Sequence, residues 1–234
     1  MTIYLIGTVH TDPQIVSRLE TSLDLIKPQT IFVEGCAEMQ PLIDGVRSKV
    51  EQGLEEAVGC KWSEATKKKI KNSIVGPMPI SEFSAVREYA SKRGICWYGL
   101  DKSKPMELVC AEALSLMPEF CYVMSKLSEK DVKEALAKAQ KNDSLDFDAA
   151  YHQFDDPDFK RLLSIIPFEM LGARDKQWEK IIRKCYQKTP DANLAVVCGD
   201  GHLIELGNRT IYDRLKDLQA KRAPLPDAVK GKYR

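Results

Sequence analysis

Two histidines that lie near opposite ends of the chain share one local pattern. His10 follows Gly7 by three positions, at the end of a short apolar run. His202 follows Gly199 in the same way after a second apolar run, and the chain has three histidines in 234 residues. Glycine allows the chain to turn sharply off a strand and allows the backbone to approach a ligand closely. One such histidine would be read as a loop residue that finds a hydrogen bond, but the matched pair predicts one shared site.

The residues on either side of His10 predict the elements that position it. Residues 2–7 predict a strand, and Asp12 with Pro13 predicts the N-cap and first position of a helix. The apolar face of that helix has its residues three and four positions apart: Ile15, Val16, Leu19, Leu23 and Ile26. A second strand at 30–34 ends in Glu34. A strand, a helix and a further strand of this length form a right-handed parallel unit, so His10 and Glu34 are expected at one sheet edge.

Two later strands bring more polar residues to the same edge. Residues 95–100 predict a strand that ends at Asp101, and residues 193–198 predict the strand before His202. Parallel strands place their carboxyl ends on one edge, where open α/β sheets bind ligands. Asp101 is therefore expected beside Glu34 if its strand is also parallel.

The helix expected at 172–187 leads into the last of these strands through a short loop. Its buried stripe has members at helical spacing: Trp178, Ile181, Ile182 and Cys185. Arg174 lies one turn earlier on the same inward face, and Asp175 follows it. The amino-terminal end of this helix is then expected beside His202. The inward Arg174 has two interpretations, a functional group of the site or the partner of a carboxylate such as Asp175 or Glu34.

Two further helices are expected between the second and third strands. Residues 37–72 predict a strongly charged helical segment, and the three lysines at 67–69 predict a solvated face. Its thin apolar stripe consists of Val46, Val50 and Leu54. A second helix begins near Ser81 and ends at Gly94.

The overall prediction is a single α/β domain over residues 1–234, with a central, mostly parallel β-sheet flanked by helices. Residues 104–167 are expected to form a helical insertion over the carboxyl edge of the sheet and offer apolar surface for a homodimer contact. His152 lies in this insertion without the glycine spacing and is not assigned to the site. A last helix at 208–221 closes the domain, and a basic tail at about 222–234 is expected to be solvated.

Composition excludes several classes of function. The formal net charge is +1, so no global field favours a nucleic acid. Seven scattered cysteines without a C-x-x-C pair indicate free thiols and a reducing compartment. No run of 18 apolar residues and no charged leader before an apolar stretch is present, which predicts a cytoplasmic protein without a membrane partner.

The topology gathers titratable side chains suited to hydrolysis. They are His10, Glu34, Asp101, Arg174, Asp175 and His202. Two histidines and a carboxylate are the ligands of a catalytic divalent metal, which lowers the pKa of a bound water. Arg174 would stabilise the developing oxyanion, and a carboxylate outside the ligand set would accept the proton of the water. The chain has neither a phosphate-binding P-loop nor a G-x-G-x-x-G fingerprint, which counts against nucleotide-dependent functions.

Several of these segments resemble one known family. The stretches at 4–10 and 31–36, with Lys27-Pro28 between them, resemble the opening of the TraB/PrgY proteins, which are relatives of the Tiki proteases and, more remotely, of the erythromycin esterases. The resemblance continues at 99–101, at Arg174-Asp175 and at 199–202, while the middle helical region matches poorly. It implies a compact α/β fold, with Gly7 and His10, Gly199 and His202, and Glu34 at the family's motif positions.

The resemblance also implies an activity. Tiki proteins are regarded as metal-dependent proteases, with manganese or cobalt favoured, and zinc is a third candidate here. TraB and PrgY are linked to shutting down peptide pheromones. The chain has neither the carboxyl-terminal membrane segments of many TraB-type proteins nor the secretion signal of Tiki-like proteins. Pheromone handling at a membrane and extracellular signalling are therefore not expected.

Three functions remain open from the sequence. The first is a metal-dependent hydrolase of a peptide or small molecule, with His10, His202 and Glu34 as ligands and with catalytic candidates Glu34, Arg174, Asp175 and Asp101. The second is a protein that binds a peptide or small ligand without turnover. The third is a metal-free esterase, as the erythromycin-esterase relatives imply, in which a histidine and a glutamate activate water directly.

Overall fold

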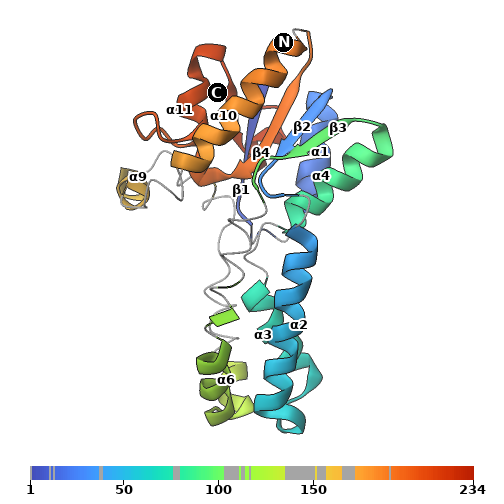
Figure 1. Ribbon diagram of the computed structural model, residues 1–234, viewed down its shortest axis with the longest axis vertical. Helices are drawn as coiled ribbons and strands as arrows, with labels where there is room; N and C mark the ends of the chain where they lie inside the picture. The colour runs from blue at the N-terminus through green and yellow to red at the C-terminus, as the bar shows by residue number, and fades with distance from the viewer. Residues whose placement is uncertain are drawn as a thin grey trace. The chain divides into compact units, whose positions relative to one another are not determined.

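The computed structural model divides the chain into two compact units (Figure 1). It describes residues 2–10, 12, 14–36, 39–75, 80–102, 111, 114–115, 117–134, 151, 157–164, 172–189 and 191–234. The sheet unit comprises Met1–Cys36, Pro79–Asp101 and Phe147–Arg234. The helical unit comprises Ala37–Met78 and Lys102–Asp146. The insertion predicted at 104–167 thus differs from the helical unit, which also includes residues 37–78 and ends before residue 147.

The sheet unit is built on five parallel strands, which confirms the predicted α/β class. They are β1 (Ile3–Thr8), β2 (Thr30–Val33), β3 (Cys96–Gly99), β4 (Leu194–Gly199) and β5 (Lys221–Pro224), in the order β3-β2-β4-β1-β5. The register pairs Thr8 with Gly199 and Val33 with both Val197 and Gly99. Most residues of the three central strands are buried, as expected for a parallel sheet with both faces covered. The carboxyl ends of all five strands therefore lie along one edge.

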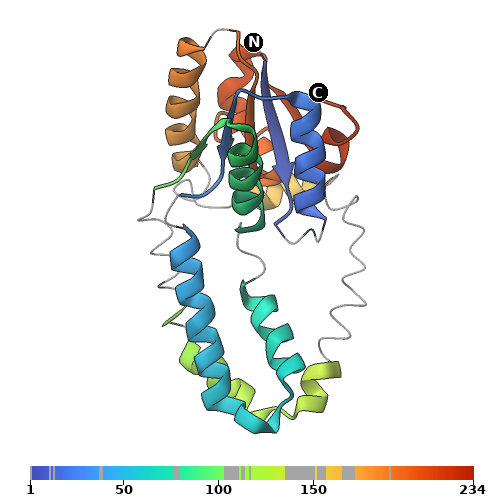
Figure 2. The same ribbon diagram turned by 90° about the vertical axis from the view of Figure 1, so that its right-hand side faces the viewer.

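Helices cover both faces of this sheet (Figure 2). The elements α1 (Ile15–Ile26) and α4 (Ile80–Arg93) pack together on one face. On the other face lie α10 (Gly172–Lys188) and α11 (Ile211–Leu215), which bury Trp178 and Leu215 against strand residues such as Phe32. The short helices η3 (Asp200–Leu203), η4 (Lys216–Leu218), α9 (Pro157–Ser164) and α12 (Leu225–Ala228) complete the described part of the unit.

Four local predictions in the sheet unit were wrong. Asp12 does not cap α1 directly, because Gln14 occupies the N-cap position and Asp12 Oδ1 accepts the backbone N–H of Gln14 at 2.8 Å. Val16 is 46% exposed and points away from the buried face of α1. The last helix, α11, is shorter than expected. The basic tail is not solvated but forms part of β5 and α12. Within it, Arg222 is buried and its guanidinium donates to the carbonyl of Leu203 at 2.7 Å.

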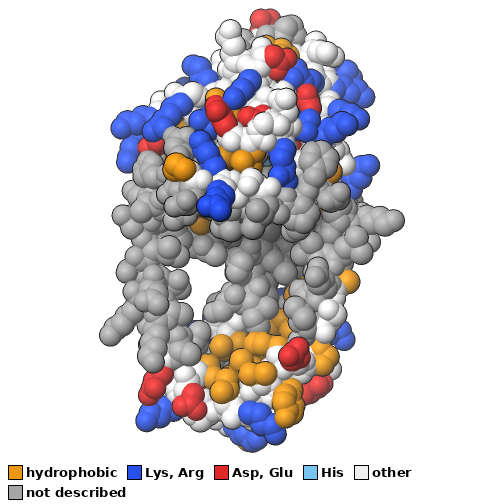
Figure 3. Space-filling view, turned by 90° about the vertical axis from the view of Figure 1, so that its left-hand side faces the viewer, with side chains coloured by type: hydrophobic (Ala, Val, Ile, Leu, Met, Phe, Trp, Pro, Cys, Tyr) orange, Lys and Arg blue, Asp and Glu red, His pale blue; other side chains and the backbone are white. Residues whose placement is uncertain are grey.

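The helical unit has a small core of its own. Its described elements are α2 (Met39–Val58), η1 (Gly59–Lys61), α3 (Glu64–Val75) and α6 (Met117–Lys126). The predicted stripe of α2 is buried and packs with partners such as Met117 and Met124 of the same unit. Figure 3 shows hydrophobic side chains gathered on one face of the unit, and Tyr122, Val123 and Leu127 are exposed at or just after α6. The homodimer stays a prediction.

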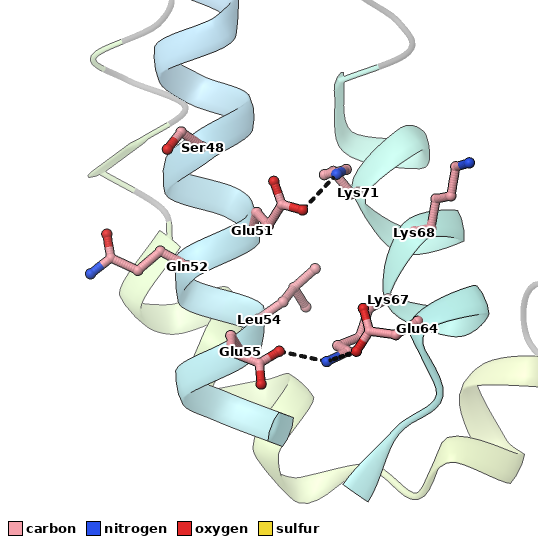
Figure 4. Close-up of a pocket in the computed structure, with 9 residues that line it drawn as sticks. All are labelled: Ser48, Glu51, Gln52, Leu54, Glu55, Glu64, Lys67, Lys68 and Lys71. Atoms are coloured by element: carbon pink, nitrogen blue, oxygen red, sulfur yellow. Dashed lines mark hydrogen bonds and ion pairs between the residues drawn. The ribbon is translucent and has the colours of Figure 1, made fainter. Parts of the chain in front are cut away.

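Ion pairs join α2 to α3 (Figure 4). Lys71 pairs with Glu51 at 2.9 Å, and Lys67 is bound by both Glu55 and Glu64. Lys67 is 8% exposed, so the prediction of a solvated face over 67–69 fails at its first residue. These residues line a hollow between the two helices. Its glutamates are paired with Lys67 and Lys71, so these side chains hold the two helices together.

In the described part of the chain, no helix is both long and apolar enough to cross a membrane.

Candidate active site

Glu34 occupies the centre of the carboxyl edge. Its backbone N–H continues the ladder by donating to the carbonyl of Val197 at 2.8 Å, which fixes the residue one position beyond β2. Its Oε1 accepts from Arg174 Nη2 at 2.7 Å and its Oε2 accepts from the backbone N–H of Gly199 at 2.7 Å. Burial raises the pKa of Glu34, but the charges of His202, Arg174 and His10 outweigh it and hold the pKa well below the usual range. Glu34 is therefore a permanently ionised, fixed carboxylate.

His10 lies in the turn that follows β1 and faces this carboxylate. Its Nδ1 pairs with Glu82 Oε1, from the first turn of α4, and its Nε2 lies 4.0 Å from Glu34 Oε2. Burial lowers the pKa of His10, but the hydrogen bond and charge of Glu82 and the charge of Glu34 raise it to about 8. The side chain is 27% exposed, so this histidine is open to solvent on one side.

His202 approaches the same carboxylate from η3, which begins directly after β4. Its Nδ1 lies 3.0 and 2.9 Å from the two carboxylate oxygens of Asp175, while its Nε2 lies 3.8 Å from Glu34 Oε1. The imidazole also packs on Trp178, with ring centroids 4.5 Å apart. Burial lowers the pKa of His202, and the charge and hydrogen bond of Asp175 raise it above its ordinary value. Asp175 is fully buried, and its two oxygens hold the orientation of the imidazole ring.

Arg174 connects two carboxylates at this edge. Its Nη2 donates to Glu34 Oε1 and to Asp101 Oδ2, both at 2.7 Å, and its Nε donates to Asp101 Oδ1 at 3.0 Å. Asp101 also accepts from Trp178 Nε1 at 3.0 Å and from the backbone N–H of Gly35 at 2.9 Å. The interpretation of Arg174 as a carboxylate partner is therefore confirmed for Glu34, with Asp101 rather than Asp175 as the second acid. The hydrogen bonds of Asp101 therefore fix the position of Arg174, of α10 through Trp178, and of the turn after β2 through Gly35.

The structure brings all six sequence-predicted residues to one edge and adds two that were not predicted. Glu82 is buried, and its Oε2 has no hydrogen-bond partner among the described residues. Asp200 is half-buried at the end of β4. Burial raises its pKa to about 6, although the N–H of Gly201 and the charge of His10 lower it. Glu82 could have been found by the argument used for Arg174, because α4 leads into β3 and its first turn lies at the same edge. Asp200 stands inside the second glycine–histidine motif.

The two motif glycines are required by close approaches. A Cβ atom on Gly7 would lie 3.2 Å from the Cα and Cβ atoms of Asp200. One on Gly199 would lie 3.3 Å from His10 Nε2 and 3.4 Å from Glu34 Oε2. These contacts agree with the expected role of glycine in bringing the backbone close to the functional groups. His152 lies outside the described residues.

The fit of this site to a metal ion depends on its donor atoms and their spacing. Among the described residues, no group of three or more His, Cys, Asp and Glu side chains has the arrangement of a metal site. The donor chemistry nevertheless fits, because each histidine has its Nδ1 on a carboxylate and its Nε2 toward Glu34, the usual outer-shell arrangement of metal-bound histidines. The Nε2–oxygen distances of 3.8 and 4.0 Å exceed hydrogen-bond length and are within the roughly 4.2 Å that two metal–ligand bonds of about 2.1 Å can span.

Comparison with known proteins found no match among family models, curated proteins or solved structures. The resemblance to the TraB/PrgY proteins therefore stays a prediction.

Proposed function

We propose that this chain is a divalent-metal-dependent hydrolase of peptide or other acyl substrates. The observation that carries the proposal is that His10 and His202, from opposite ends of the chain, both direct Nε2 toward Glu34 while a carboxylate holds each Nδ1. His10, His202 and Glu34 would hold the ion, with manganese, cobalt and zinc as the candidates. A bound ion would supply Lewis acidity and lower the pKa of a coordinated water.

The charge balance of the site favours a cation. Among the described residues, the edge holds five carboxylates, from Glu34, Glu82, Asp101, Asp175 and Asp200, and one permanently positive group, Arg174. Without an ion, the excess negative charge is offset by protonation, because the pKa of both histidines is raised. A divalent cation would supply the same compensation with neutral imidazoles, the form that binds metals.

The remaining groups divide the chemical work. Glu34 is a weak base because its pKa is held low, which suits a ligand and disfavours the metal-free mechanism in which it would accept a proton from water. Asp200 has a pKa of about 6 and would accept that proton. Arg174 uses Nε and Nη2 on its carboxylates, and its Nη1 donates to no described residue, so it is placed to bind a substrate oxygen as negative charge develops.

The proposal is tested by metal analysis of chelator-treated protein that has been reloaded separately with Mn²⁺, Co²⁺ and Zn²⁺. We expect about one equivalent of at least one ion, lost in His10→Ala and in His202→Ala. The matched control is His152→Ala, which removes the third histidine and should keep the metal. Negligible metal in the wild type after all three reloadings would overturn the proposal.

Turnover is measured on the same samples with a fluorogenic peptide set and p-nitrophenyl esters. The proposal expects product that depends on the reloaded ion. Metal retention without any product would identify a binding protein, and activity that persists under chelator would identify a metal-free esterase. Either result would contradict the proposed function.

A further inference from the structure

The two edges of the sheet are finished differently. The outer edge of β5 is paired within the chain, since the N–H of Arg222 donates to the carbonyl of Arg234 at 2.8 Å and the N–H of Arg234 donates back at 2.9 Å. The opposite edge strand, β3, pairs with β2 and with no other described strand. β3 contains neither a charged residue nor a proline, the usual means by which proteins protect an open edge.

The ladder between β2 and β3 identifies the backbone groups that face outward. The N–H of Leu100 donates to the carbonyl of Val33 at 2.9 Å, and alternate residues of a parallel strand bond to the same neighbour. Cys96 and Tyr98 therefore direct their backbone groups toward β2, whereas Trp97 and Gly99 direct theirs away from the sheet. Among the described residues, none forms a hydrogen bond with these outward groups.

A groove of about 380 Å³ lies beside this strand, between it and α10. Tyr98 is 51% exposed on its wall and stacks on Phe32 with ring centroids 5.7 Å apart. Lys184 and Lys188 line the groove from α10, and neither forms an ion pair with a described residue. An aromatic surface, two exposed cationic side chains and unpaired backbone groups thus lie together on one edge of the sheet unit.

We propose that β3 is a docking strand for an extended peptide segment with acidic side chains, which adds to the sheet beyond β3. Backbone groups of the peptide would pair with those of Trp97 and Gly99. Side chains alternate between the faces of a strand, so every second one would enter the groove beside Tyr98 and meet Lys184 or Lys188. This docking goes beyond the proposed hydrolase activity and is tested by binding alone.

The charges distinguish this occupant from a second copy of the chain. Two β3 strands paired antiparallel about a two-fold axis would form a continuous sheet, with both α10 helices on the same face. Lys184 and Lys188 of the two copies would then face each other across the junction, because an isologous interface brings the same patch to both sides. Like charges opposed in this way are unfavourable, whereas an acidic strand complements them.

The test uses the full chain and a capped hexapeptide of alternating valine and glutamate, followed by amide hydrogen exchange measured by NMR. At about 1 mM peptide, we expect exchange at the amides of Trp97 and Gly99 to slow by roughly tenfold or more. A Lys184→Ala, Lys188→Ala double variant should weaken binding by roughly fivefold to tenfold. The control Lys180→Ala removes an exposed lysine of α10 that does not line the groove and should bind like the wild type.

Two altered peptides and one thiol footprint sharpen the result. Lysine in place of glutamate, or N-methylation of alternate peptide amides, should abolish the exchange protection. Bound peptide should slow alkylation of Cys96, which is exposed beside the groove, but not that of Cys60, which is exposed in the helical unit. The proposal is overturned by the absence of binding, by binding without protection of Trp97 and Gly99, or by protection that rises with protein concentration alone and so reports a second copy.

Discussion

The backbone N–H of Gly199 donates to Glu34 Oε2 at 2.7 Å and so joins the end of β4 to the carboxylate that follows β2. A methyl group at Gly199 would lie 3.3 Å from His10 Nε2, closer than most side chains tolerate. We expect Gly199→Ala to weaken metal binding by roughly tenfold or more, because the outer-shell geometry of a metal site is sensitive to such shifts. Competition with a fluorescent chelator measures the loss.

Gly45→Ala is the matched control for this substitution. Gly45 lies within α2, and a Cβ atom there would meet nothing within 4 Å. Alanine should raise the free energy of unfolding by up to about 1 kcal/mol through helix propensity and leave metal affinity unchanged. Equal metal affinities in the two variants would show that the approach of Gly199 to His10 is not needed for binding.

Arg174→Ala should destabilise the fold by about 3 kcal/mol, because it leaves the buried carboxylates of Glu34 and Asp101 without their cation. Urea unfolding in the absence of metal measures the change. Arg183→Ala is the comparison, since Arg183 pairs with the exposed Asp217 and such pairs contribute at most about 1 kcal/mol. A loss for Arg174→Ala no larger than that for Arg183→Ala would contradict the central role of this guanidinium.

Asp175→Asn tests the group that holds His202. The amide oxygen is an uncharged and weaker acceptor for the Nδ1–H, and the amide NH2 can instead donate to Nδ1. The tautomer with Nε2 free for a ligand therefore loses its support. We expect metal affinity to fall by about 10-fold to 100-fold, as followed by titration calorimetry. Asp217→Asn removes a carboxylate at the exposed end of an ion pair and should leave the affinity as it was.

The metal-free protein should lose stability as the pH rises through about 8. Folding raises the pKa of His10 from 6.5 to about 8, so its contribution is complete below pH 6.5 and disappears above the folded pKa. The difference of 1.5 units (8 − 6.5) corresponds to on the order of 2 kcal/mol, at 1.36 kcal/mol per unit. In Glu82→Gln, burial would dominate and this contribution should vanish. Urea unfolding of the wild type and of Glu82→Gln at about pH 6 and about pH 9 measures the difference. An identical pH dependence in the two proteins would refute this role of the pair between His10 and Glu82.

Strands could be predicted where burial dictates composition. β1, β2 and β4 are short apolar runs that end at glycine or glutamate, and each was expected within one or two residues of its observed position. β5 could not be predicted in this way, because its residues, Lys221 to Pro224, have no apolar alternation and are suited to an edge position. Its contacts depend on residues far away in the sequence, such as Leu203 and Tyr4, which no local pattern reveals.

The site was predictable to the extent that topology positions it. His10, Glu34, Asp101, Arg174 and His202 follow from the rule that parallel strands end at one edge. The pairing of side chains was not predictable, because Asp101 and Asp175 lie on the same edge. Differences of a few ångströms decide that Arg174 pairs with Asp101 while Asp175 pairs with His202. The helical unit was misjudged for a related reason, since periodicity shows that α2 has an apolar face but not what that face contacts.

The strand order has a consequence for synthesis of the protein. β4 pairs with both β1 and β2, yet 160 residues lie between the end of β2 at Val33 and the start of β4 at Leu194. A chain emerging from the ribosome therefore presents β1 and β2 with the place between them unfilled, and their unpaired edges are exposed to aggregation during that time. Glu34 receives neither the Gly199 hydrogen bond nor His202 until β4 has been made and inserted. The carboxyl edge around Glu34 is consequently incomplete until most of the chain has been translated.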